Sequence, residues 1–439
     1  MRKKKNAFTL IELLAVIVIL AVILVISIPR ILDVIETSKK DSFKNAAQLI
    51  ADSAEKKKAS YKLLDKYEEI TCKDVAKIND EDYASCKISF DSEGNAKVSI
   101  TGKGKFDGLK ITNGTKENAE VKEITKPTHG MKATEYITNL LEYDGEGLKI
   151  DNTPDQNIRY YGSNPNNYVL FNNELWRIIG VFGSNVKLIR NEKLGNLSWD
   201  SSESSINRGY GVNEWSQADL KNYLNTMYYE GTSVTCYNEK NNQTTTCPSN
   251  KLDETSKSLI DNHTWNIGAI DKTDTTIVNP ETFAINTVSF YKAERGTTNG
   301  KICNGRDACN DTVTRTTEWT GYIGLPYPTD YAYASSESDC ETNMNAGDID
   351  FDNGIFNMTC KKNNWMHHGT TMEIEDATWF MSPVADPDYA ANVWYVLGGG
   401  LTNDSCAAYP FSAFPTIYLK SNIIIESGKG TSSDPYILK

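Results

Sequence analysis

The residue with the clearest chemical role in this chain is Glu12, which is the single ionisable residue in an apolar run of twenty-one residues, 8–28. A carboxylate inside a bilayer costs about 2.5–3.5 kcal/mol on insertion scales, so Glu12 needs a partner. Cleavage between Ala7 and Phe8 would create an α-ammonium group four residues from Glu12. This amine, on the same or a neighbouring chain, would neutralise the carboxylate.

Cysteine spacing is the second chemical feature. Four pairs would each close a short loop in polar sequence, with Cys406 left over: Cys72 and Cys86, Cys236 and Cys247, Cys303 and Cys309, Cys340 and Cys360. This spacing favours disulfides in an oxidising extracellular compartment, although the connectivity cannot be deduced from sequence and neighbour pairing is one solution among several. Zinc is the competing interpretation, but no Cys-x2-Cys spacing occurs and the histidines lie apart from the cysteines.

Three carboxylates are spaced as in a calcium loop, at Asp348, Asp350 and Asp352. The turn glycine of such loops is displaced by one position here, and Thr359 stands where a bidentate glutamate would close the site. We therefore favour a solvated acidic loop over calcium and predict no metal or other cofactor.

Other candidate catalytic groups are weak. The pair His367–His368 beside Trp365 would point in two directions from a helix or strand, which favours a surface role over a metal or catalytic one. No Gly-x-Ser-x-Gly motif and no phosphate-binding glycine motif occurs. We expect that the protein is not an enzyme.

Aromatic residues beside Asn and Asp provide the remaining signal. Exposed rings that stack on sugars would indicate a glycan-binding or surface-binding site, and the candidates near loops are Tyr327, Tyr331, Tyr333, Trp365, Tyr389 and Tyr409. By contrast, we assign Trp176, Trp379 and Trp394 to the core.

The apolar run that contains Glu12 must be a helix if it lies in lipid. Its length is about 31 Å at about 1.5 Å per residue, which is enough to span a bilayer. The basic residues 2–5 precede the run, so the N-terminus should be cytoplasmic and the remainder extracellular. Beyond Pro29 an apolar stripe continues to Tyr61, which predicts one long helix, kinked at Pro29, whose second half packs on a sheet.

A small antiparallel sheet is predicted next. Segments 86–90 and 96–101 alternate apolar and polar residues around a turn at 91–95, and a third short strand covers 106–111. We place the end of this domain near residue 125. A polar connector with a weak helix at 132–143 follows, over residues 126–156.

Residues 157–439 predict a β-rich α+β extracellular domain. A hairpin is expected around Asn172–Asn173, followed by a strand at 186–190 and short helices at 215–227 and 252–259. Further short strands are expected in the second half, at 321–325, 330–334, 377–383, 393–396 and 414–419.

The basic leader, Phe8-Thr-Leu-Ile-Glu12, the apolar run and Pro29 together resemble the class III signal of type IV pilins and pseudopilins. This resemblance covers about the first tenth of the chain. It implies cleavage before Phe8 by a prepilin peptidase, N-methylation of Phe8, and assembly with other pilin subunits through Glu12. Ala7 departs from the glycine usual before the cut, and we expect processing to survive at a lower rate.

Two simpler interpretations of the N-terminus are a secretory signal peptide and a plain signal anchor. A signal peptide would have a shorter apolar core and a small-residue cleavage site after it, whereas Ser27-Ile-Pro-Arg30 is a poor site. A signal anchor would leave Glu12 unexplained.

The large domain also resembles a widespread extracellular domain of bacterial surface proteins, through Leu175-Trp-Arg-Ile-Ile179, Trp379-Phe-Met-Ser-Pro383 and Gly430-Thr-Ser-Ser-Asp-Pro-Tyr436 among other segments. The resemblance implies a relation to C-type-lectin-like and sulfatase-modifying-factor folds, and hence a ligand-presenting scaffold.

The sequence therefore predicts five parts: leader 1–7, helix 8–60, small pilin-like domain 61–125, linker 126–156 and large domain 157–439. The formal net charge of −12 argues against nucleic acid as a partner of the ectodomain. We expect a minor or tip subunit of a cell-surface filament, first anchored in the membrane, with an adhesin-like domain that could bind surface glycans. The alternatives are a pseudopilin of a type II secretion or DNA-uptake system, and a membrane-anchored enzyme or sugar-binding protein.

Overall fold

The computed structural model describes residues 10–64, 68–76, 81–202, 211–239, 243–296, 313, 315–350, 353, 355–368, 377–386 and 391–439. The chain divides into two compact units. Unit 1 comprises Met1–Lys126 with Glu142–Asp144, and unit 2 comprises Pro127–Leu141 with Gly145–Lys439. Each unit has its own hydrophobic core.

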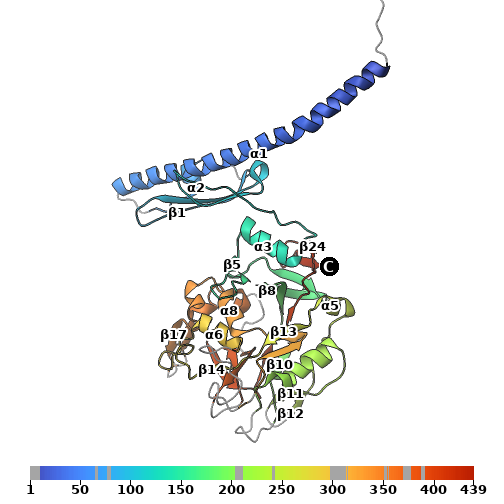
Figure 1. Ribbon diagram of the computed structural model, residues 1–439. Helices are drawn as coiled ribbons and strands as arrows, with labels where there is room; N and C mark the ends of the chain where they lie inside the picture. Colours follow the sequence, from blue (N-terminus) through green and yellow to red (C-terminus); the bar gives the residue numbers. More distant parts are fainter. Residues whose placement is uncertain are drawn as a thin grey trace, which may run out of the picture. The chain divides into compact units, whose positions relative to one another are not determined.

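Unit 1 contains one long helix, α1 (Leu10–Leu63), which Figure 1 shows in blue. It also contains a four-stranded antiparallel sheet in the order β1-β2-β3-β4. Its remaining elements are α2 (Cys72–Val75), β1 (Tyr83–Phe90), β2 (Ala96–Gly102), the 3-10 turn η1 (Gly104–Phe106), β3 (Leu109–Gly114) and β4 (Lys122–Glu123). The predicted helix and the first two strands are confirmed. The third strand runs over Leu109–Gly114 and not over 106–111, because Gly104–Phe106 forms a 3-10 turn, and β4 was not predicted.

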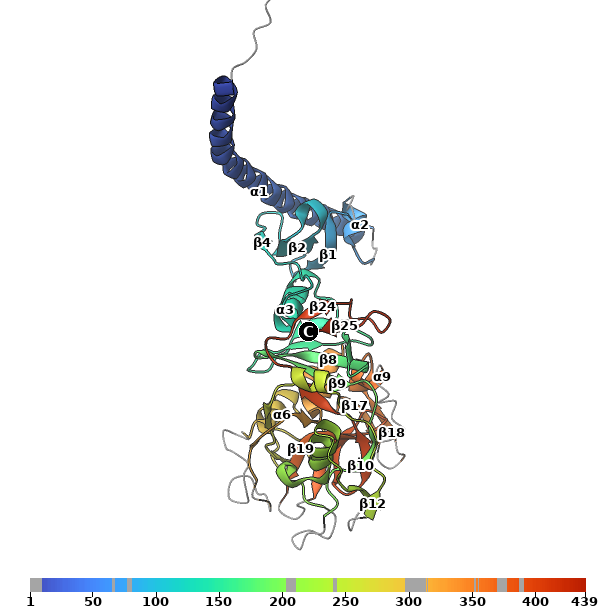
Figure 2. The same ribbon diagram turned by 90° about the vertical axis from the view of Figure 1, so that its right-hand side faces the viewer.

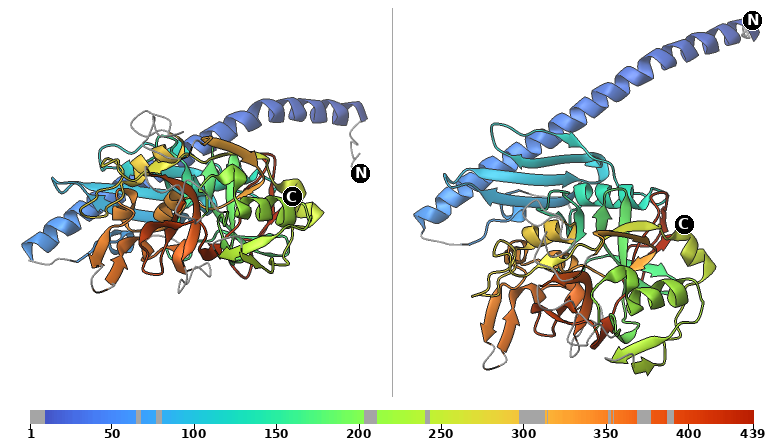
Figure 3. Two further views of the ribbon diagram at one scale, coloured as in Figure 1. Left: turned by 90° about the horizontal axis from the view of Figure 1, so that it is seen from below. Right: turned by 60° about the horizontal axis from the view of Figure 1, so that its bottom comes forward.

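The second half of α1 covers one face of this sheet (Figure 3). Its buried residues, Phe43, Ala47, Ile50, Ala51 and Ala54, recur at three- and four-residue spacing on one side of the helix. Phe43 packs its ring 5.2 Å from that of Phe106. The small alanines allow the helix to lie close to the strands, so a single apolar stripe is sufficient to hold it.

The larger sheet of unit 2 has nine strands, with β16-β23-β9-β8-β7-β25-β24 as its main path and β6 joining β5 to β8. Their bounds are β5 (Leu148–Ile150), β6 (Ile158–Tyr160), β7 (Tyr168–Phe171), β8 (Glu174–Phe182), β9 (Asn185–Arg190), β16 (Ile323–Gly324), β23 (Thr416–Tyr418), β24 (Ile425–Ser427) and β25 (Tyr436–Leu438). The predicted hairpin is present, and Asn172 and Asn173 both have positive φ angles, as a type I′ turn requires.

A second sheet has the order β10-β22-β19-β20-β21, with β14 paired to β19, and three two-stranded ribbons complete the β structure among the described residues. The sheet strands are β10 (Gly195–Ser198), β14 (Ile270–Asp271), β19 (Thr378–Ala385), β20 (Asn392–Val396), β21 (Thr402–Cys406) and β22 (Pro410–Ala413). The ribbons are β11 (Cys236–Glu239) with β12 (Gln243–Thr245), β13 (His263–Asn266) with β15 (Glu318–Gly321), and β17 (Gly347–Asp350) with β18 (Ile355–Met358).

Short helices connect these strands (Figure 2). They are α3 (Ala133–Tyr143), η2 (Trp215–Gln217), α4 (Asp219–Asn222), the π-helical η3 (Tyr223–Tyr229), α5 (Glu254–Leu259), α6 (Thr287–Glu294), α8 (Pro328–Ala334), η4 (Ser338–Glu341), η5 (Thr359–Lys361) and α9 (Trp365–His368). The β-rich α+β prediction for this region is confirmed.

One strand prediction was wrong: residues 330–334 belong to helix α8. Pro328 lies in the first turn of the helix, where its missing N–H costs nothing. The Asp330 carboxylate accepts a hydrogen bond from the Tyr327 backbone N–H at 2.9 Å, which caps the helix N-terminus. The alternating aromatic and small residues imitated a strand, but the Pro and Asp positions decided the helix.

The segment 126–156, predicted as a polar connector, is largely a folded part of unit 2. It contains α3 and β5, and Ala133, Tyr136 and Ile137 are buried in the core of unit 2. The apolar face of α3 was present in the sequence, but its polar surroundings concealed the fact that the helix packs against the large domain.

Candidate functional site

The first half of α1 presents an apolar surface that nothing else in the described chain covers. Its large hydrophobic side chains are exposed from Leu10, at 83%, to Ile35, at 57%. A continuous exposed apolar surface along half of a long helix indicates contact with a membrane or with other protein chains. Among the described residues, α1 is the one helix that is long and apolar enough to cross a membrane.

Several predicted site residues lie on or before this helix. The backbone of Glu12 is helical, and Pro29 lies inside the helix on an exposed side. Ala7 and Phe8 lie outside the described residues. Proline cannot donate to the carbonyl four residues earlier, and α1 bends along its length in Figure 2.

After the apolar run, charged side chains first appear on the exposed surface at Arg30 and Asp33, and they become frequent beyond Ile35. Glu36 and Lys40 form an i,i+4 ion pair at 2.8 Å, and Lys40 also pairs with Glu123 of β4. The hydrogen bond and the charge of Lys40 lower the pKa of Glu36. Because the two carboxylates are exposed and Lys40 is only partly buried, these pairs add little stability, and they mark the point where the helix becomes compatible with water.

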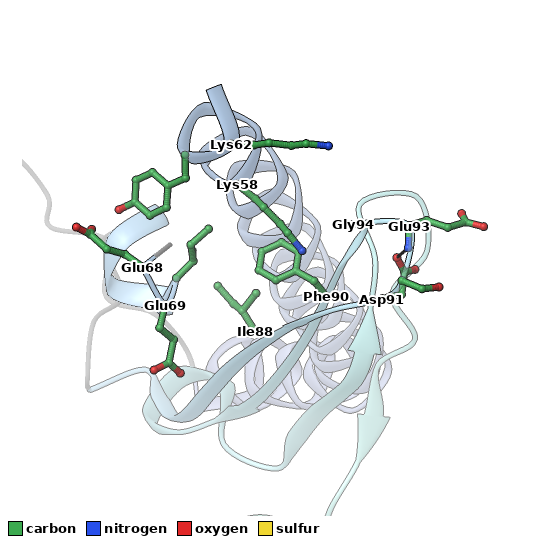
Figure 4. A pocket seen from close by; sticks show the side chains of 12 residues that line it. Lys58, Lys62, Glu68, Glu69, Ile88, Phe90, Asp91, Glu93 and Gly94 are labelled. Atoms are coloured by element: carbon green, nitrogen blue, oxygen red, sulfur yellow. Dashed lines mark hydrogen bonds between the residues drawn. The ribbon is translucent and has the colours of Figure 1, made fainter. Parts of the chain in front are cut away.

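Unit 1 also has an open pocket of about 550 Å³ between the C-terminal part of α1 and the β1–β2 turn (Figure 4). Ile88 and Phe90 line it, and the Lys58 ammonium lies 3.8 Å from the centre of the Phe90 ring. Figure 4 shows Glu68 and Glu69 on one side and Asp91 and Glu93 on the other. Asp91 Oδ1 accepts hydrogen bonds from the backbone N–H groups of Glu93 and Asn95 in its own turn, at 3.0 and 2.9 Å.

Three of the four predicted cysteine pairs are disulfides in unit 1 or unit 2. Cys72–Cys86 ties α2 to β1, Cys236–Cys247 closes the β11–β12 ribbon, and Cys340–Cys360 joins η4 to η5. Cys303 and Cys309 lie outside the described residues. Cys406 forms no disulfide with a described cysteine, and burial followed by the charge of Asp404 raises the pKa of its thiol.

Two of the three calcium candidates, Asp348 and Asp350, lie among the described residues. Asp348 and Asp350 lie on β17, and the Asp350 carboxylate accepts hydrogen bonds from the Asn353 backbone and side chain at 3.1 and 2.7 Å. Asp352 is outside the described residues. Within the described ranges, no cluster of three His, Cys, Asp or Glu residues could hold a metal ion.

Most of the aromatic candidates for sugar binding are core residues. Tyr327, Tyr331, Tyr333 and Trp365 are each at most 3% exposed, so a sugar ring cannot stack on them. Tyr409 is exposed at 54%, and Tyr389 lies outside the described residues. The core assignment of Trp176, Trp379 and Trp394 agrees with their burial.

The surface interpretation of His367 was wrong. The side chain is 6% exposed, and its Nδ1 lies 3.1 Å from the hydroxyl of the buried Tyr331. His367 is therefore a core residue with a hydrogen-bond partner, because α9 turns it inward.

A buried charge cluster in unit 2 has no counterpart in the sequence predictions. Asp330 accepts contacts from Arg159 Nη1 at 2.6 Å and from Lys187 Nζ at 2.5 Å, and Arg159 Nε contacts Asp151 at 2.8 Å. The four side chains are at most 1% exposed. The sequence held one signal for this cluster. Arg159 and Lys187 each stand between two apolar residues in a short strand, which is typical of strands buried on both faces.

Comparison with known proteins assigns a known sequence motif to the N-terminal region. Residues 2–28 match the family model for the prokaryotic N-terminal methylation motif. No curated protein and no solved structure matches the chain. The chain thus carries a type IV pilin-like class III signal, which implies processing by prepilin peptidase and assembly with other pilin subunits. The relation of the large domain to C-type-lectin-like folds stays a prediction.

Proposed function

We propose that this prepilin-processed, pilin-like or pseudopilin-like subunit is a minor or tip component of a cell-surface filament, and that unit 2 is an adhesin-like domain displayed outside the cell. The observation that carries the proposal is the exposed apolar half of α1, which overlaps the methylation motif over residues 10–28. A helix with this surface needs lipid before assembly and neighbouring helices afterwards.

The size of unit 2 favours a minor or tip position. It spans about seven tenths of the chain and has its own sheets and core. A domain of this bulk on every subunit would crowd the surface of a fibre whose helices pack side by side. A place at the tip, or at widely spaced positions, would avoid that crowding.

A display role is also more consistent with the chemistry of unit 2 than an enzymatic one. The group of ionisable side chains around Asp330 is closed to solvent, so a dissolved substrate cannot reach it. We therefore propose that unit 2 acts by binding at its surface. Disulfides such as Cys340–Cys360 suit a domain that works outside the cell.

The decisive measurement is the mass of the N-terminal peptide of the protein isolated from its host. A peptide that begins at N-methylated Phe8 is expected. A peptide that begins at Met1 would mean that Ala7 blocks processing, and the filament role would have to be abandoned. Labelling with antibody against unit 2 then tests the position: signal at fibre tips or at rare sites supports the proposal, whereas signal absent from surface fibres supports a pseudopilin.

A further inference from the structure

The ion pair between Lys187 and Asp330 is excluded from solvent. Lys187 is on β9 and Asp330 is on α8, 143 residues further along the chain, and their side chains are 0% and 1% exposed. Aromatic rings surround the Lys187 ammonium, with the ring centre of Tyr327 at 4.2 Å, Tyr418 at 5.3 Å and Phe182 at 5.4 Å.

Burial lowers the pKa of the Lys187 ammonium. Loss of water disfavours the ammonium, and although Asp330 opposes this effect, the pKa of Lys187 falls to about 8. An uncharged amine is the nucleophilic form of lysine. The Lys187 side chain is thus close to that form and is held 2.5 Å from a carboxyl oxygen.

We propose that Lys187 and Asp330 condense to form an intramolecular amide, an isopeptide cross-link between β9 and α8. Nζ of Lys187 attacks Cγ of Asp330, a C–N bond forms, and Oδ2 of Asp330 leaves as water. Both protons of this water come from the Lys187 ammonium, which keeps its third as the amide N–H. No oxidant, metal or other co-reactant is required.

The contact of the other Asp330 oxygen matches this reaction, whereas Oδ2, which also accepts the Tyr327 backbone N–H at 2.9 Å, gives up that helix cap when it leaves. Arg159 Nη1 lies 2.6 Å from Oδ1, the oxygen that becomes negative in the tetrahedral intermediate and ends as the amide oxygen. Burial raises the pKa of Asp330, but Lys187 and Arg159 together outweigh burial and lower it. Asp330 is therefore ionised before the reaction. The reactive pair, a neutral amine and a neutral carboxylic acid, forms when Nζ of Lys187 transfers a proton to Oδ2 of Asp330 along their hydrogen bond.

Charge balance in the cluster also favours the product. Before the reaction the ion pairs of the cluster join two cations, Arg159 and Lys187, to two carboxylates, Asp151 and Asp330. The buried carboxyl of Glu294 lies beside them, and burial raises its pKa, which favours its neutral form. Condensation removes one charge of each sign and leaves the pair Arg159–Asp151, which is 2.8 Å apart. Because each buried ion carries a desolvation penalty, removing two of them in a dry site is favourable.

The test is peptide mapping of the purified full chain in detergent, after reduction of disulfides and digestion with trypsin. The expected product is a branched peptide that joins the Lys187 and Asp330 segments and is lighter than their sum by one water. Trypsin should not cleave after Lys187, because it requires a free amine. Recovery of linear peptides cleaved after Lys187, from protein shown by circular dichroism to be folded, would overturn the proposal.

A matched control exists in the same unit. Lys149 Nζ lies 2.8 Å from Glu341 Oε1, but these side chains are 16% and 30% exposed, so this pair should stay uncondensed. Lys187→Arg should abolish the branched peptide. Asp330→Asn should form the same cross-link with loss of ammonia, and a branched peptide that persists in Lys187→Arg would contradict the assignment.

Discussion

The carboxyl of Glu294, at the end of α6, is fully buried beside the Asp330 cluster. Its oxygens accept hydrogen bonds from the Thr329 hydroxyl at 2.8 and 3.0 Å. Burial, opposed by Arg295, raises the pKa of Glu294 to about 7. The folded state therefore keeps this proton at pH values where the unfolded chain has lost it.

This difference predicts that unit 2 becomes less stable as pH rises through the window between the unfolded and folded pKa values, about 4.5 to about 7. The free energy of unfolding should fall by on the order of 3 kcal/mol across the window, and Glu294→Gln should remove most of that fall. Urea unfolding at both ends of the window measures it. The exposed Glu281→Gln is the control and should keep the wild-type slope; an unchanged slope in Glu294→Gln would refute the prediction.

The expected role of Glu12, unlike that of Glu294, depends on contact with other chains. We expect Glu12→Leu to insert into the membrane at least as well as wild type, because the cost of a carboxylate in lipid disappears. Incorporation into filaments should be lost, because the partner ammonium of the neighbouring subunit has no carboxylate to bind. Immunoblots of sheared surface fibres and of membranes measure the two effects. Val16→Leu, in the same run, should behave as wild type; equal amounts of Glu12→Leu in the fibre fraction would exclude the pairing.

At the scale of elements, the packing of α1 on its sheet depends on a few buried side chains. Phe43→Ala removes a fully buried ring beside Phe106 and should destabilise unit 1 by about 3–5 kcal/mol. Leu49→Ala, on the same helix but 66% exposed, should change the stability by less than about 0.5 kcal/mol. Hydrogen exchange of the β2 amides in the detergent-solubilised chain reports both. Similar exchange in the two variants would show that the stripe does not anchor the helix.

At the scale of the whole molecule, separate cores predict separate unfolding. Calorimetry of the full chain with intact disulfides should show two transitions, one for each unit. Phe43→Ala should lower one of them. Gly180→Ala should lower the other, because a Cβ at this position would lie 2.0 Å from the carbonyl oxygen of Ile158. A single transition that moves in both variants would show that the units unfold together.

The sequence alone determined the features that local pattern encodes. An apolar run, a stripe at helical spacing, alternation of apolar and polar residues, and an Asn–Asn turn between apolar segments each restrict the backbone within a few residues. For this reason α1, the first two strands of the small sheet and the β7–β8 hairpin were predictable. The cysteine pairs that are described join positions close in sequence, for which neighbour pairing was the simplest solution.

Only the tertiary structure decided which side chains are buried and which distant charges meet. The rings of Tyr331 and Trp365 lie near loops in sequence, yet long-range packing places them in the core. Lys187 and Asp330 are 143 residues apart, and no local pattern specifies their contact. Burial and the pairing of charges depend on how whole sheets and helices close around a site, because that closure determines both distance and access to water.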